Sequence, residues 1–183
     1  GKLGAKPEGN MSRLQTARLT LRPLAQSDVS MLHQFWTDPE VRRYLWGDQI
    51  MSESTISEIV DASEQFFQTT GSGFFALEHK EQAGELVGFC GHRQFEDGER
   101  VELLYAITPE YWGEGLVTEA AREVLRHGFS SCGFETVIAA TDTPNQPAVR
   151  VMQRLGMIFD RRTQFHDLDT VFYTLSKADF EPR

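Results

Sequence analysis

The sequence has only two cysteines, no long apolar run and fewer basic than acidic residues. Cys90 and Cys132 lie far apart in the chain, which fits neither a disulfide framework nor the paired spacing of zinc ligands. We expect both to be reduced thiols in the core. The five histidines show no His-x-x-x-His or Glu pairing, so the sequence predicts no metal site.

No stretch reaches the ~20 apolar residues that cross a bilayer, and residues 1–10 lack the apolar segment of a signal peptide. We therefore expect a cytoplasmic protein without membrane contact. Lys and Arg number 18 against 27 Asp and Glu, which gives a formal net charge of −9. Because such a surface repels a polyphosphate backbone, the composition disfavours nucleic acid as a partner and favours a cationic substrate.

The remaining composition is typical of one globular domain. The chain has 183 residues, of which 40% are hydrophobic and 25% charged, enough for a sizeable core. No internal repeat, low-complexity block or long linker divides it. Residues 1–15 begin with a leader that shows no periodicity, so we expect a disordered leader or cloning remnant there and a single domain over 16–183.

Apolar periodicity predicts an alternation of strands and helices along this domain. The predicted strands are 18–23, 73–78, 85–95, 100–107 and 136–140, followed by a hairpin over 157–176. The predicted helices are about 27–37, 41–45, 52–71, 116–133 and 147–155. Turn residues separate the three middle strands, which indicates an antiparallel meander. The order predicts an α/β fold with a mixed sheet.

The most informative segment leads from the strand at 100–107 through a glycine-bearing turn into the helix that starts at Leu116. The first N–H groups of a helix have no partner within the helix. Gly113 and Gly115 lack Cβ atoms, so an anion can approach these groups, and the helix dipole adds a favourable field. The segment therefore predicts an anion site, with an ordinary strand-to-helix turn as the alternative. Thr118 stands in place of the third glycine of the dinucleotide fingerprint, and no P-loop lysine follows.

In its wider context the segment resembles the coenzyme A loop of the GNAT superfamily of N-acetyltransferases, in the RimJ/RimL-like branch. The residues that carry the resemblance are Glu102, Pro109-Glu110-Tyr111-Trp112-Gly113-Glu114-Gly115 and Thr118-Glu119-Ala120. Residues 16–24 are similar to the opening strand of that branch, 38–41 to the turn after its first helix, and 145–157 to its late Asn…Leu-Gly-Phe segment. The likeness covers essentially residues 16–176.

This resemblance implies a single-domain α/β fold. Its mixed, mostly antiparallel central sheet is flanked by helices, with parallel strands splayed at the coenzyme A site. It further implies acetyl-CoA as cosubstrate and transfer of the acetyl group, by direct attack, to a primary amine. That amine is either a protein N-terminal α-amino group, as in ribosomal-protein acetylation, or a small molecule. The protein is then a monomer or a homodimer. A sensor that binds acetyl-CoA without turnover is the alternative.

Site residues follow from the same resemblance. Backbone groups of the strand are expected to meet the pantetheine arm, and the glycine turn is expected to wrap the pyrophosphate. Asn145 is expected to contact the pantetheine, with an ordinary helix N-cap as the alternative. Val117 is bulkier than the small residue common at its position. The residues implied to bind the cofactor are Tyr105, Ala106, Ile107, Trp112, Gly113, Glu114, Gly115, Leu116, Val117, Thr118 and Asn145.

Acetyl transfer requires a neutral amine, whereas lysine-like amines have pKa values of about 10.4 and α-amino groups of about 8. A base must therefore lie nearby. Glu102 is the candidate, acting through water, and a solvated glutamate facing Arg93 or Arg100 is the alternative. Met152 aligns with the position at which many relatives carry a hydroxyl that protonates the leaving thiolate. A thioether cannot donate a proton, so water, the emerging ammonium or another hydroxyl would do so.

Two further features have alternative interpretations. Cys90-Gly91-His92 has the residue types of a nucleophile and its base, but a buried thiol is the favoured interpretation. Acidic clusters at 38–40, 96–97 and 167–169 suggest a negative potential that attracts an ammonium, with solvated acidic faces as the alternative.

Overall fold

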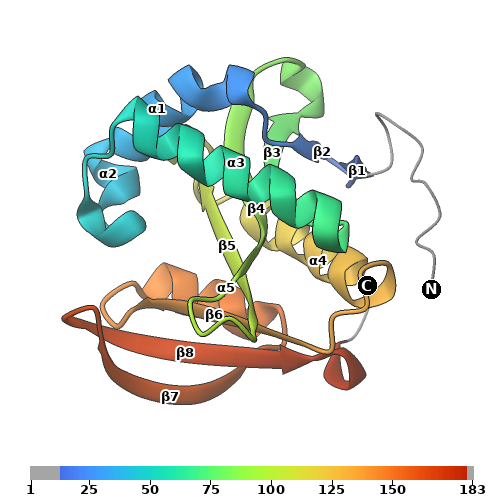
Figure 1. The fold of residues 1–183 in the computed structure, drawn as a ribbon, viewed down its shortest axis with the longest axis vertical. Coiled ribbons are helices and arrows are strands. Elements are labelled where there is room, and N and C mark those ends of the chain that lie inside the picture. Colours follow the sequence, from blue (N-terminus) through green and yellow to red (C-terminus); the bar gives the residue numbers. More distant parts are fainter. Residues whose placement is uncertain (1–12, 181–183) are drawn as a thin grey trace.

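The computed structural model describes residues 13–180 (Figure 1). Most of the predicted leader, residues 1–12, lies outside the described residues. Strand β1 (Leu14–Gln15) pairs antiparallel with strand β2 (Leu19–Pro23). The sheet therefore begins before residue 16, where the sequence placed the domain boundary.

The centre of the molecule is an eight-stranded sheet in the order β1-β2-β3-β4-β5-β6-β8-β7. Its other strands are β3 (Phe74–His79), β4 (Leu86–Gln94), β5 (Val101–Ile107), β6 (Thr136–Asp142), β7 (Ile158–Phe165) and β8 (Leu168–Ser176). All neighbours pair antiparallel except β5 and β6, which are parallel. The predicted meander of β3, β4 and β5 and the closing hairpin of β7 and β8 are confirmed.

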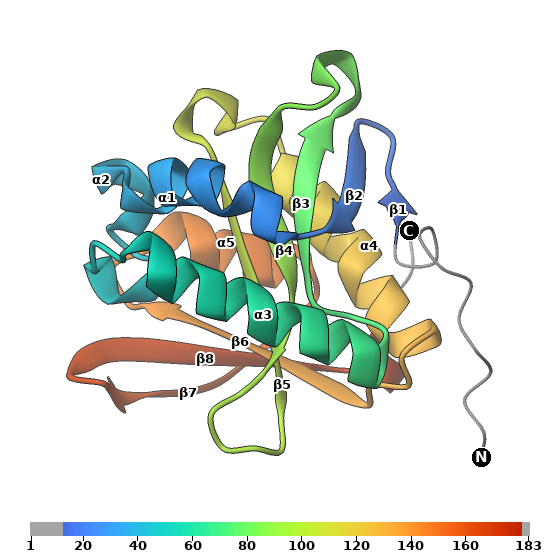
Figure 2. The same cartoon turned by 45° about the horizontal axis from the view of Figure 1, so that its top comes forward.

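Helices cover both faces of this sheet (Figure 2). On one face lie α1 (Val29–Thr37), α2 (Pro39–Arg42) and α3 (Glu53–Thr70), and on the other lie α4 (Leu116–Ser130) and α5 (Gln146–Arg154). Neighbouring residues of a strand point to opposite faces. Phe74 accordingly packs with the core of α1 to α3, and Phe75 with the core of α4.

Local sequence explains the helix ends. Ser52 is the N-cap of α3, and its Oγ accepts a hydrogen bond from the Thr55 N–H at 3.1 Å. Gly71 ends the same helix with a φ of 92°, a conformation that glycine adopts without steric cost. The predicted helix at 41–45 is instead the short α2, because Asp38 caps it and Pro39 occupies its first turn. Within residues 13–180, no helix is long and apolar enough to cross a membrane.

The sheet opens between its two parallel strands. In the described ladder, β5 and β6 pair at Val101 with Val137 and at Glu102 with Ile138. Beyond these positions β5 continues along β4 to Ile107, and β6 continues along β8 to Asp142. The two strands therefore diverge as predicted, and their facing backbone edges are left without ladder partners from each other.

The outer edge strand, β7, is exposed along nearly its whole length. Ile158 and Phe159 are the most exposed large apolar residues at its start. The register shifts between Phe159 and Arg161, which places a bulge at Asp160.

The cysteines differ in burial. Cys90 on β4 is fully buried, as predicted, whereas Cys132 after α4 is partly buried and packs against the edge of the same core. The difference arises because Cys132 follows the last turn of α4, where the chain returns to the surface, and its Sγ lies 3.4 Å from Nε2 of His127.

Candidate active site

The divergence of β5 and β6 creates a cleft of about 480 Å³, which we call the β5–β6 cleft. Its walls come from the two strands, from α5, from the segment after α2 and from the turn between β7 and β8. Residues that line it include Tyr44, Trp46, Arg93, Glu96, Glu102, Tyr105, Thr141, Asp142, Asn145, Met152 and His166. The chain thus gathers titratable side chains from distant segments around one cavity.

Glu102 lies where the cleft closes, at the last position at which β5 still pairs with β6. The whole Glu102 residue is only 7% exposed. Arg93 is its register partner on β4, and Arg93 Nε donates a hydrogen bond to Glu102 Oε1 at 2.9 Å. Burial raises the pKa of Glu102, and the Arg93 charge partly offsets that rise. The alternative of a solvated glutamate is therefore wrong, because Glu102 is buried. Its other part, that Glu102 faces Arg93, is confirmed.

Arg93 also contacts the aromatic wall of the cleft. Its Cζ lies 5.3 Å from the ring centroid of Trp46, within cation–π range. Trp46 sits in a 3₁₀ turn with a φ of 56°, and it is packed against Trp36 at a centroid distance of 5.1 Å. A bulky residue in this left-handed conformation is strained, so the surrounding aromatic packing must hold it.

The glycine turn lies at the carboxyl end of β5. Trp112 Nε1 donates to the carbonyl of Ile107 at 2.9 Å, which fixes the start of the turn. Gly113 and Gly115 have φ values of 83° and 77°, and Gly115 is the N-cap of α4. The Glu119 N–H donates to the Gly115 carbonyl at 3.1 Å. The N–H groups of residues 116–118 therefore belong to the first turn, whose amides point out of the helix end.

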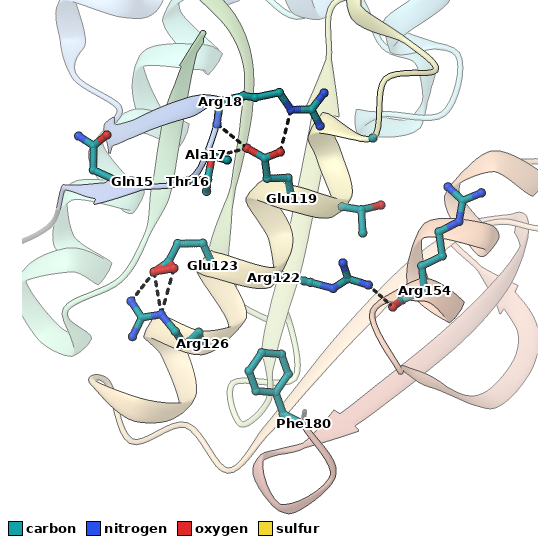
Figure 3. A pocket seen from close by; sticks show the side chains of 12 residues that line it. Gln15, Thr16, Ala17, Arg18, Glu119, Arg122, Glu123, Arg126, Arg154 and Phe180 are labelled. Atoms are coloured by element: carbon teal, nitrogen blue, oxygen red, sulfur yellow. Dashed lines mark hydrogen bonds and ion pairs between the residues drawn. The ribbon is translucent and has the colours of Figure 1, made fainter. Parts of the chain in front are cut away.

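A second cavity of about 710 Å³ runs from this turn along the outer side of α4 (Figure 3), and we call it the α4 groove. It gathers four arginines in a chain of net negative charge: Arg18, Arg122, Arg126 and Arg154. Glu119 binds Arg18 at 2.8 Å, Glu123 binds Arg126, and Arg122 donates to the Arg154 carbonyl at 3.0 Å. Sequence reasoning missed this groove, although the spacing of Arg122 and Arg126 on one helical face was a usable signal.

Asn145 uses both ends of its amide within the chain. Its Oδ1 accepts from the Ala148 N–H at 3.4 Å, and its Nδ2 donates to Thr141 Oγ1 at 2.9 Å. The N-cap alternative is thereby confirmed, and a contact with pantetheine stays a prediction. The Tyr105 hydroxyl donates to the Ala148 carbonyl at 3.2 Å, so Tyr105 ties β5 to α5 across the cleft. Burial raises the pKa of that hydroxyl.

The other reactive side chains are placed as follows. Met152 is buried and lines the cleft, so a thioether does stand there. Burial raises the pKa of the Cys90 thiol, while His92 Nδ1 lies 2.7 Å from Ser72 Oγ. The buried-thiol interpretation of Cys90 is therefore confirmed. Among residues 13–180, no group of three or more His, Cys, Asp or Glu side chains is arranged to hold a metal ion.

The comparisons agree with this geometry. Residues 18–158 match the family model described as an acetyltransferase (GNAT) domain, so the chain belongs to the GNAT acetyltransferase family. The protein is an acetyl-CoA-dependent N-acetyltransferase. Of the two alternatives, an enzyme and a sensor without turnover, the comparisons support the enzyme.

Three similar proteins illustrate the range of this family. N-acetyltransferase p20 of Bacillus licheniformis is 25% identical over 93% of this chain and 99% of its own. Spermidine N(1)-acetyltransferase of Escherichia coli is 30% identical over 74% of this chain and 70% of its own. The structure of RimL, the ribosomal L7/L12 alpha-N-protein acetyltransferase, in complex with coenzyme A has the same fold. It shows a TM-score of 0.75 at 15% identity and covers 90% of this chain and 97% of RimL.

Proposed function

We propose that this enzyme acetylates a primary amine by direct attack of the amine on the thioester, with Glu102 as the general base acting through water. One observation carries the assignment. Glu102 is the single carboxylate at the closed end of the β5–β6 cleft among residues 13–180, and it is buried there with its pKa raised. A base works best when its pKa approaches the operating pH, and burial moves a carboxylate in that direction.

The shape of the chain fits the cosubstrate. Acetyl-CoA supplies the activated acetyl group as a thioester. The edges of β5 from Tyr105 to Ile107 and of β6 beyond Ile138 offer backbone N–H and C=O groups that do not pair with each other. Residues 112–118 offer the amides of the glycine turn and of the first turn of α4 to the pyrophosphate, and Arg18 offers a cation beside that turn, since its Nη2 lies 3.8 Å from the place of a Cβ on Gly115. Asn145 would meet the pantetheine from the start of α5.

The proton path follows from the same residues. Glu102 accepts the proton of the substrate ammonium through water, which leaves the amine lone pair free to attack. Backbone N–H groups near Tyr105 would polarise the thioester carbonyl. Because Met152 cannot donate, one of the two protons still on the attacking nitrogen goes to the departing thiolate, and the other stays on the amide product.

Several side chains that line the β5–β6 cleft favour a cationic acceptor. Glu96 and Asp142 add carboxylates to the lining, and burial raises the pKa of Asp142. Tyr44 and Trp46 provide aromatic faces on which an ammonium can lie. The acceptor is a small cationic amine, as in the spermidine relative, or a protein N-terminus, as in RimL.

A panel of acceptors tests the proposal. Spermidine, lysine amide and a peptide with N-terminal serine are incubated with the enzyme and acetyl-CoA, and free thiol is measured. We expect release with at least one of them, confirmed by mass spectrometry of the acetylated product. The same acceptor with its amine already acetylated is the control. Thiol release that stays at the rate of hydrolysis for every amine would contradict the proposal.

A further inference from the structure

Arg93 has an unusual position for a half-exposed arginine. Two kinds of contact hold its guanidinium at the cleft wall: the 2.9 Å hydrogen bond to the Glu102 carboxylate and the 5.3 Å stack on Trp46. The Arg93 side chain is 43% exposed, whereas that of Glu102 is 9% exposed. The guanidinium is therefore more accessible to solvent than the carboxylate that it binds, and both line the cleft.

Other charged groups around Glu102 work against its ionisation. Glu96, on the loop after β4, raises the pKa of Glu102 and is bound to His166 of the β7–β8 turn at 2.8 Å. Asp142 at the end of β6 adds a further carboxylate to the lining, and Tyr44 and Tyr105 add phenol hydroxyls, of which burial raises the pKa of Tyr105. Arg93 is the one Lys or Arg side chain of that lining among the described residues.

We infer that Arg93 is a positioning residue for acetyl transfer: its guanidinium keeps the Glu102 carboxylate ionised and oriented until the amine arrives. This inference rests on the proposed role of Glu102 as base. In the step itself, one proton leaves the substrate ammonium, passes through water and ends on a Glu102 oxygen, while the electron pair stays on the nitrogen. Arg93 remains protonated throughout, because a guanidinium does not deprotonate in proteins.

A purely structural Arg93 would brace Trp46 and the β4–β5 pair without affecting proton transfer. The pH dependence of kcat/KM distinguishes this structural role from the proposed positioning role. Removing an adjacent opposite charge raises the pKa of a carboxylate by roughly 1–3 units, and we expect about one unit because Arg93 is half-exposed. The acidic limb of the kcat/KM profile would move by the same amount, a tenfold loss per unit at pH values below the limb.

The experiment compares Arg93→Met and Arg93→Lys with the wild type. The Glu102 carboxyl is titrated by ¹³C NMR in the protein without ligand, and kcat/KM is followed against pH with the best amine of the panel. We expect Arg93→Met to raise both the carboxyl pKa and the acidic limb, and Arg93→Lys to restore most of the shift. Arg93→Gln, which is neutral but polar, gives the same upward shift if the methionine variant does not fold.

Arg100→Met is the matched control. Arg100 lies on the same hairpin, binds Asp97 at 2.6 Å and stacks on Phe95 at 5.0 Å, but it does not line the cleft. This variant leaves the Glu102 titration in place.

Different results would contradict the role of Arg93 and the role of Glu102. An unchanged Glu102 pKa and limb in both neutral variants of Arg93 would overturn the inference about Arg93. An acidic limb that persists in Glu102→Gln would instead overturn Glu102 as the base.

Discussion

Among the buried titratable groups of strands β4 and β5, Glu102 and His92 face opposite sides of the sheet, and their surroundings differ. Glu102 faces the β5–β6 cleft. His92, one residue before Arg93 on β4, faces α4 and is fully buried, with Nδ1 bound to Ser72 and its ring 5.0 Å from that of Phe134. A Cβ on Gly128 would come within 2.7 Å of His92, so the helix leaves no space around the ring.

The comparison separates burial from access. Burial raises the pKa of Glu102, and burial, with a smaller contribution from His127, lowers the pKa of His92 to about 3. Both groups resist ionisation, but a ligand can reach only Glu102 through a cavity. A buried group with a shifted pKa is therefore a candidate for catalysis when it lines a cavity. When packing encloses the group on all sides, its shifted pKa makes the stability of the fold depend on pH.

The largest expected effect is on turnover. Glu102→Gln keeps the side-chain shape but removes the basic carboxylate, so we expect kcat to fall by ~10²–10⁴ with little change in acetyl-CoA affinity. His92→Asn, which still hydrogen-bonds Ser72, is expected to change kcat only a few-fold. Steady-state kinetics and calorimetry measure the two quantities. Similar losses of kcat in both variants would remove the distinction.

The next effect is on stability in acid. Below pH 6.5 the unfolded chain protonates His92, while the folded chain does so only near pH 3. The free energy of unfolding therefore falls as the pH drops through this window, by on the order of 3 kcal/mol at pH 4 from this group. Urea unfolding of wild type and His92→Asn at pH 7, 5.5 and 4 measures it. We expect the variant to show the flatter dependence.

Glu102 contributes to the pH dependence of the free energy of unfolding with the opposite sign. Its raised folded pKa means that the folded state keeps a proton which the unfolded chain has already released. Its contribution to stability therefore falls as the pH rises from 4.5 through the folded pKa. Glu102→Gln removes this term and steepens the loss in acid, whereas His92→Asn flattens it. Parallel curves for the two variants would contradict the comparison.

The third effect is on acetyl-CoA affinity at the glycine turn before α4. Gly115→Val places a β-branched residue at a φ of 77° and fills the approach to the first amides of α4, so we expect about tenfold weaker acetyl-CoA binding by calorimetry. Gly133→Val is the matched control, since Gly133 lies after the other end of α4 with a φ of 74° and no neighbour within 4 Å of a Cβ. Equal affinities in the two folded variants would contradict a pyrophosphate site at Gly115.

The smallest effect concerns salt. Glu96 and Asp142 in the cleft and the net charge of −9 should attract a cationic acceptor, so its kcat/KM should fall several-fold as salt rises and the Debye length shrinks from ~10 Å at 0.1 M to ~3 Å at 1 M. The KM of acetyl-CoA, which carries the opposite charge, should improve or stay flat. Rates independent of salt for every cationic acceptor would favour a neutral or protein-terminal one.

The sequence predicted the succession of strands and helices from β2 to β8, the meander of β3 to β5 and the glycine turn, and it offered the N-cap at Asn145 as an alternative, because each depends on residues close together in the chain. The resemblance added Glu102 and the splayed strands, which no local pattern indicates. Arg93 appeared only as one of two partners for Glu102. The contact of Ser72 with His92 was not predicted, since it joins the end of α3 to β4 through packing that residue patterns do not encode.

The edge at β7 has a consequence for how the sheet ends. An exposed outer strand offers free backbone groups to any neighbouring chain, which is the geometry on which fibrils grow. Here the bulge at Asp160 interrupts the flat edge, and the charges of Arg161 and Arg162 follow it directly. These features oppose the addition of a ninth strand from another molecule, so we expect the solubility of this edge to depend on a backbone bulge and on arginines that take no part in acetyl transfer.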